Sequence, residues 1–230
     1  MSEKFYAWDF DRMLGLTELL AVEFTKHVAE TDPATAEILR ATKEAVEKSK
    51  GSFDMLGAIR EHMGELALRN YVDGFVGRQH EVSFLEEGAE VLLHDVAEGG
   101  HRSGIITRGG VEWQKIKLRK TGLEGVPHLI LSKEDDIKGK LIASWYDSTT
   151  GLYRLPDELG GGFVEEVVLV EDKETEFDGF PTQASARGYL FTGSDIKPET
   201  EVSTKPLSPN IVRVNSLHEI ARHEGLKASS

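Results

Sequence analysis

The chain of 230 residues contains no cysteine, which excludes disulfide bonds, thiolate catalysis and cysteine-ligated zinc or iron–sulfur sites. It also lacks any apolar run approaching the roughly 18 residues of a membrane-spanning helix. The N-terminus does not have the charged and then apolar profile of a signal peptide. We therefore expect a cytoplasmic protein without a membrane partner.

Positive charge is also in short supply, because 27 Lys and Arg residues face 40 Asp and Glu residues, giving a net charge of -13. This balance argues against a nucleic acid or an anionic membrane as partner, since both would be repelled. A phosphorylated small molecule would bind only where a metal ion and local cations reverse the field inside one cleft. The length and the 39% hydrophobic content allow one α/β domain with an insertion, or two small domains.

The chain has two kinds of region, which differ in the pattern of their apolar residues. Residues 16–80 show helical periodicity almost throughout and contain no strand candidate. Elsewhere, short apolar runs alternate with helical stretches, at 4–8, 103–107, 127–132, 166–171, 187–192 and 210–214. Strands separated by helices predict βαβ units and a mostly parallel sheet, in which ligands bind beyond the carboxyl ends of the strands.

Polar side chains follow four of these runs. Asp9 and Asp11 come directly after the first strand and, two residues apart, lie on the same side of the chain. Two carboxylates so close favour a bound divalent cation or a proton on one of them. The later strand ends offer Thr107 before a glycine turn, a lysine-rich loop, and Glu171-Asp172. Taken singly, these motifs also fit capping aspartates, an N-cap threonine, a solvated lysine and an acidic helix start.

In this order, the four motifs resemble those of the haloacid dehalogenase-like (HAD) hydrolase superfamily, and the resemblance covers most of the chain. It implies an α/β fold, a HAD-like Rossmannoid three-layer sandwich with a mostly parallel sheet, plus a helical cap. Residues 1–15 and 81–230 would form the α/β core. Residues 16–80 would form the cap, inserted between the first and second motifs.

The resemblance also implies catalytic roles. Asp9 would be the nucleophile that forms an aspartyl phosphate, and Asp11 the general acid that protonates the leaving group and later activates water. The motif lysine is predicted to be Lys138, because Lys-Gly followed by an apolar pair matches the family, with Lys133 as second choice and Lys140 also available. The substrate phosphate would be bound by Thr107, Arg108 and Gly109.

A magnesium site is implied as well. Asp9, the backbone carbonyl of Asp11 and Asp172 would hold Mg²⁺, with Glu176 or Glu171 acting through water. Asp172 and Glu176 share a face if a helix starts at the strand end, since they are four residues apart.

The function expected from this resemblance is a Mg²⁺-dependent phosphatase acting on a small phosphorylated metabolite. One alternative is a phosphomutase with the same phospho-aspartate chemistry. The other is a catalytically silent HAD-fold binding or scaffold protein, suggested by Met13, which stands where the family usually has Thr or Val. The sequence names neither the substrate nor the oligomeric state.

Overall fold

The computed structural model describes residues 2–48, 54–131, 136–193 and 207–226, and it divides the chain into two compact units. Residues 1–15, 85–109 and 125–230 form the α/β unit, and residues 16–84 and 110–124 form the helical unit. Residues 81–84 and 110–124, which the sequence assigned to the core, therefore group with the helices instead. Among the described residues, no helix combines the length and the apolar character needed to cross a membrane.

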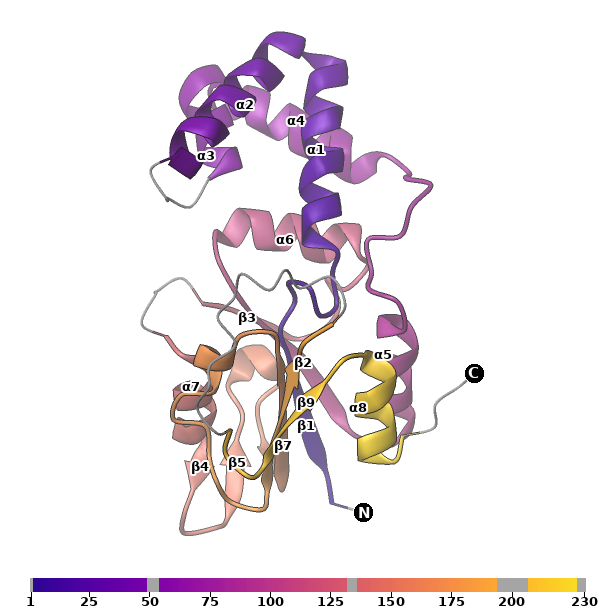
Figure 1. Cartoon of the computed structure of the whole chain (residues 1–230), viewed down its shortest axis with the longest axis vertical. Helices are drawn as coiled ribbons and strands as arrows, with labels where there is room; N and C mark the ends of the chain where they lie inside the picture. The colour runs from indigo at the N-terminus through magenta and orange to yellow at the C-terminus, as the bar shows by residue number, and fades with distance from the viewer. Residues whose placement is uncertain (1, 49–53, 132–135, 194–206, 227–230) are drawn as a thin grey trace. The chain divides into compact units, whose positions relative to one another are not determined.

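The centre of the α/β unit is a six-stranded sheet in the order β3-β2-β1-β7-β8-β9 (Figure 1). Each neighbouring pair is parallel, so the predicted mostly parallel sheet is confirmed. Each of these six strands lies within one residue of its predicted bounds. The strands are β1 (Lys4–Trp8), β2 (Arg102–Arg108), β3 (His128–Leu131), β7 (Glu166–Glu171), β8 (Ala186–Phe191) and β9 (Ile211–Val214).

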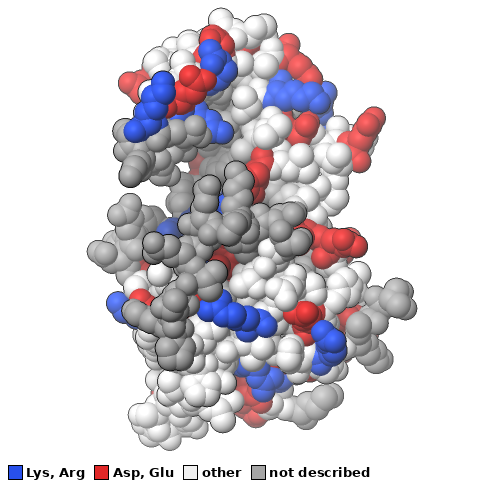
Figure 2. Space-filling view, in the orientation of Figure 1, with Lys and Arg blue, Asp and Glu red and all other residues white. Residues whose placement is uncertain are grey.

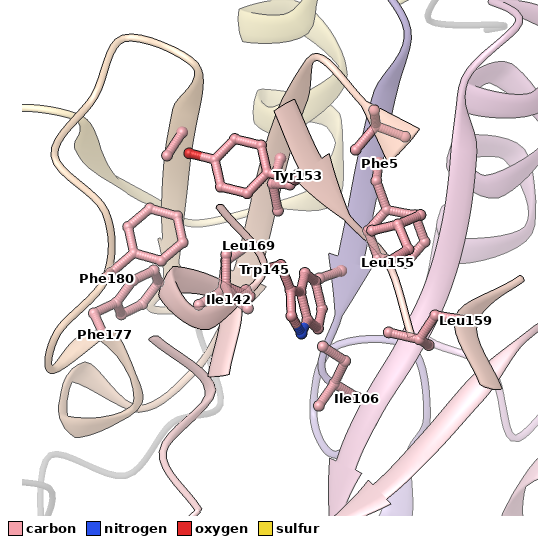
Figure 3. Packing of buried hydrophobic residues seen from close by; sticks show 14 of the residues in the cluster. Phe5, Ile106, Ile142, Trp145, Tyr153, Leu155, Leu159, Leu169, Phe177 and Phe180 are labelled. Carbon is pink, nitrogen blue, oxygen red and sulfur yellow. The ribbon is translucent and has the colours of Figure 1, made fainter. Parts of the chain in front are cut away.

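The two faces of this sheet carry different layers. Along β1, Phe5 and Ala7 join a hydrophobic cluster with Trp145 and Tyr153 on one face (Figure 3). This face is covered by α7 (Lys138–Ser144) and a small antiparallel sheet of β4 (Tyr146–Asp147), β5 (Leu152–Arg154) and β6 (Phe163–Val164). On the opposite face lie α5 (Ala89–Glu98) and α8 (Leu217–Glu224). The small sheet was not predicted, because strands of two or three residues are too short to show an alternating pattern.

Two short 3₁₀ helices, η1 (Asp157–Leu159) and η2 (Glu174–Phe177), complete the unit.

The helical unit packs around the apolar faces of its helices. Its elements are α1 (Thr17–Thr31), α2 (Pro33–Lys48), α3 (Met55–Met63), α4 (Glu65–Gly77) and α6 (Val111–Lys120). Ile116 of α6 joins the cluster built on Phe24 and Leu68, which explains why α6 groups with these helices. Helical periodicity continues past Met55 in the sequence, but the structure has two helices there, because Gly64, with φ 82°, ends α3 and starts α4.

The negative net charge is not gathered in one place on the face shown in Figure 2, where acidic and basic side chains are intermingled. On α2, for example, Arg40 pairs with Glu37 and Glu44, each at 2.5 Å. Exposed pairs of this kind contribute little to stability.

Candidate active site

Two carboxylates are brought together by the register of the central strands. Trp8 pairs with Val170, and the amide of Asp9 donates to the Val170 carbonyl at 2.9 Å. Because side chains alternate along a strand, Asp9 and Glu171 lie on the face of the sheet that α7 covers. Asp9 is 5% exposed and Glu171 1% exposed. The strand period thus aims both acids at the first turn of α7.

Lys138, the first residue of α7, forms ion pairs with both acids. Its Nζ donates to Asp9 Oδ1 and to Glu171 Oε2, and its side chain is 2% exposed. The next residue must be glycine, because a Cβ at Gly139 would lie 2.8 Å from the Asp178 carbonyl oxygen and 2.9 Å from the Phe180 nitrogen. Glycine lets the backbone of α7 approach close enough for Lys138 to reach the strand ends.

The other two lysines considered for this role do not share the position of Lys138. Lys133 lies outside the described residues, and Lys140 is exposed on α7. The structure therefore brings Lys138, and not Lys140, to Asp9.

Proton affinities in this site are shifted by burial and by crowding of charge. Burial, reinforced by the neighbouring Glu171 charge, raises the pKa of Asp9 to about 7. Burial also raises the pKa of Glu171 to about 7, although the charge of Lys138 opposes the shift. For Lys138, burial alone would lower the pKa, but attraction to Asp9 and Glu171 outweighs it and the pKa is raised. The lysine stays charged, and the carboxylates compete for protons.

A third carboxylate completes what we call the acidic cluster, which consists of Asp9, Glu171 and Asp172. One oxygen from each of the three lies within 4.8 Å of the other two. Glu171 Oε1 already accepts the amides of Asp172 and Lys173, each at 3.0 Å. By contrast, Asp172 Oδ1 is buried and has no hydrogen-bond partner among the described residues. A buried, unsatisfied carboxylate oxygen beside two other acids is a fitting ligand for a hard divalent cation such as Mg²⁺.

Glu176, predicted to act on the metal through water, lies outside the acidic cluster. Its Oε2 accepts the backbone N–H of Lys138 at 3.0 Å, and its Oε1 accepts from the Arg108 guanidinium at 3.0 Å. The carboxylate therefore satisfies the amino end of α7 rather than facing Asp172. Arg108, predicted to bind phosphate, also donates to the Asp136 carbonyl, so its guanidinium is engaged within the protein.

The remaining predicted site residues lie at the same edge of the sheet. Asp11 is partly buried and near enough for its charge to raise the pKa of Asp9. Thr107 is fully buried near the end of β2, and Gly109, with φ 136°, donates its amide to Leu131. Met13 is fully buried as a packing residue. The phosphate-binding and acid roles stay predictions.

Comparison with known proteins adds information on the fold. No protein-family model and no curated protein matches the chain. Among solved structures, it is similar to a protein described as a haloacid dehalogenase-like hydrolase from Burkholderia xenovorans LB400, at 16% identity over 98% of each chain, with a TM-score of 0.61. It is also similar to a protein assigned as a β-phosphoglucomutase from Thermotoga maritima, at 14% identity, covering 96% of this chain and 98% of that chain, with a TM-score of 0.53. The chain has the HAD-like fold, as its motifs predicted.

Proposed function

We propose that this protein is a Mg²⁺-dependent phosphatase that hydrolyses a small phosphate monoester through an aspartyl phosphate on Asp9. The observation that carries the proposal is the acidic cluster itself. The buried Asp9 is held by Lys138, and one of its oxygens lies within 4.8 Å of an oxygen of Asp172. On that neighbouring carboxylate, Oδ1 lacks a hydrogen-bond partner among the described residues. A structural ion pair would not need that third carboxylate.

In the proposed reaction, an oxygen of Asp9 attacks phosphorus as the bond to the leaving alkoxide breaks, and Asp11 gives its proton to the alkoxide. Asp11 then takes a proton from water as the water oxygen attacks the phosphoryl group, releasing inorganic phosphate and restoring the Asp9 carboxylate. Lys138 holds Asp9 in place and offsets charge on the phosphoryl oxygens. Mg²⁺, held by Asp9, Asp172 and the Asp11 carbonyl, would neutralise phosphoryl charge as a Lewis acid. The helical unit is the part of the chain that we propose as the cap.

The test is phosphate release from a broad panel of phosphorylated metabolites with Mg²⁺. We expect D9N to lower the rate by about a thousandfold or more, because the amide cannot act as the nucleophile. The matched control is D157N, which makes the same change at an exposed aspartate in η1. We also expect EDTA to abolish turnover. Undiminished release by D9N would show that Asp9 is not the nucleophile.

A phosphomutase is the second candidate, supported by the similarity in fold to the protein assigned as a β-phosphoglucomutase. Both reactions would use the phosphorylated Asp9, so the products must separate them. A phosphatase releases inorganic phosphate, whereas a mutase returns a phosphorylated isomer. A catalytically silent protein would give neither product while still binding Mg²⁺.

A further inference from the structure

Arg12 has an unusual backbone for its residue type. Its φ is 62°, and it is the one non-glycine residue with positive φ in the part of the chain that the structure describes. This left-handed conformation suits glycine and is unfavourable for a residue with a Cβ. Glycine would serve the turn between Asp11 and Met13 better. The presence of arginine at this position therefore needs another explanation, and the contacts of its side chain provide one.

The guanidinium of Arg12 lies beside the acidic cluster. Its Nη1 is 3.8 Å from Asp172 Oδ2, and the Arg12 side chain is 48% exposed while that of Asp172 is 5% exposed. Asp172 Oδ1, on the same carboxylate, has no hydrogen-bond partner among the described residues. Lys138, which also pairs with the cluster, is buried and bound to two carboxylates. Of these two cations, Arg12 is the one that a ligand from solvent can reach.

Resting on the phosphatase proposed above, we propose that Arg12 is a specificity-determining residue with two opposing effects. It competes with the divalent cation for Asp172, and it offers its exposed charge to the phosphate group of the substrate. A divalent cation bound at Asp172 offsets the carboxylate charge that attracts the guanidinium, which weakens this ion pair. The exposed guanidinium is then held less tightly by Asp172, and it meets an anion that the net charge of -13 would otherwise repel.

The signature of this role is a pair of changes with opposite signs. Removing the Arg12 charge should strengthen binding of Mg²⁺ alone by about three- to tenfold, because one competing positive charge is lost. The same change should weaken binding of inorganic phosphate to the Mg²⁺-saturated protein by about three- to tenfold. A merely structural role would not move the two affinities in opposite directions.

The experiment is titration calorimetry of R12G, first with Mg²⁺ and then with inorganic phosphate. Glycine accepts φ 62°, so R12G should fold at least as well as the wild type, which its melting temperature checks. R12K keeps the charge and should stay near wild type in both titrations. R222Q removes the same charge from Arg222 of α8, which is 75% exposed and 3.9 Å from Glu219, and should change neither affinity.

The outcomes are distinct. Tighter Mg²⁺ and weaker phosphate in R12G alone would support the role. Unchanged or weaker Mg²⁺ binding, or unchanged phosphate binding, in R12G would overturn it. If the wild type itself binds no Mg²⁺, the proposed phosphatase fails, and the inference about Arg12 falls with it.

Discussion

The α/β unit buries two groups of charged side chains that differ in how their charge is balanced. In the acidic cluster, three carboxylates share buried Lys138 and the more distant, half-exposed Arg12. In the second group, which we call the Glu224 group, the carboxylate of Glu224 in α8 accepts from four donors. They are Lys4 Nζ at 2.7 Å, Tyr6 Oη at 2.9 Å, Arg187 Nη1 at 2.6 Å and Tyr189 Oη at 2.6 Å.

The two groups shift proton affinity in opposite directions. Burial alone would raise the pKa of Glu224, but its bonds to Lys4, Tyr189 and Arg187 outweigh burial and lower the pKa to about 2. In the acidic cluster, burial and repulsion between the carboxylates outweigh the attraction to Lys138, and the pKa of Asp9 rises to about 7. A buried carboxylate with enough donors stabilises the fold. Carboxylates that outnumber their buried cation are suited to hold a metal ion.

The sharpest way to break this contrast is to remove the buried cation of the acidic cluster. We expect K138M to lower the free energy of unfolding by about 3–5 kcal/mol, because it leaves buried carboxylates without their partner. Phosphate release should be lost as well. Urea unfolding at pH 7 measures the stability, and K140M, at an exposed position of the same helix, is the control. A K138M protein as stable as K140M would show that Lys138 does not balance the cluster.

Neutralising Glu224 tests the other group. We expect E224Q to lower the free energy of unfolding at pH 7 by about 2–3 kcal/mol. Lowering a pKa from 4.5 to about 2 corresponds to about 3.4 kcal/mol, and solvent around the partly buried Glu224 reduces that value. A depressed folded-state pKa gives stability that is complete above the unfolded pKa and is lost as pH falls through the folded pKa. The difference between wild type and E224Q should therefore hold above pH 4.5 and vanish between pH 4.5 and about 2.

Urea unfolding across this pH range checks the prediction for Glu224, with E158Q at an exposed glutamate of η1 as control. Phosphate release per folded molecule should not change, because Glu224 lies on the face of the sheet opposite α7. A difference that stays constant down to pH 2 would mean that Glu224 is not held as the anion by its donors.

A smaller effect is expected when the position of Lys138 changes but its charge does not. In G139A, the added methyl group meets the Asp178 and Phe180 backbone, so α7 must shift, at about 1–3 kcal/mol of stability. Because Lys138 moves with α7, we expect phosphate release to fall by about a hundredfold. G125A is the matched control, since nothing lies within 4 Å of a Cβ there. Equal activity in the two variants would rule out this role for Gly139.

The sequence could predict the acidic cluster because local rules decide its parts. Apolar runs end at Trp8 and Val170, and parallel strands present their carboxyl ends at one edge, which brings Asp9 near Asp172. Lys138 was predicted from its glycine neighbour, and the close approach at Gly139 is the physical reason for that pattern. The same two-residue period could have put Glu171 in the cluster ahead of Glu176, since Glu171 is in phase with the buried Leu169.

The Glu224 group could not be predicted in this way. Its partners are far apart along the chain, 220 residues in the case of Lys4, and no short motif joins them. Its existence depends on how α8 packs against the sheet, which is a tertiary property. Likewise, nothing local marked α6 as part of the helical unit, because its apolar residues would suit either unit.

The last test compares E224Q with D172N, two substitutions that each neutralise one carboxylate, by the sign of their effect on stability. We expect D172N to stabilise the metal-free protein by about 1 kcal/mol in EDTA, because it removes one buried charge from a cluster with too many. Burial raises the pKa of Asp172, so its ionised form opposes folding at neutral pH.

Saturating Mg²⁺ should then stabilise the wild type but not D172N, because only the wild type keeps the ligand. Unfolding of both proteins in EDTA and in Mg²⁺ measures these changes in the free energy of unfolding. D157N is the control at an exposed position. If D172N were instead destabilised in EDTA, like E224Q, the acidic cluster would be balanced as it stands, and its excess charge could not be the reason that it binds a cation.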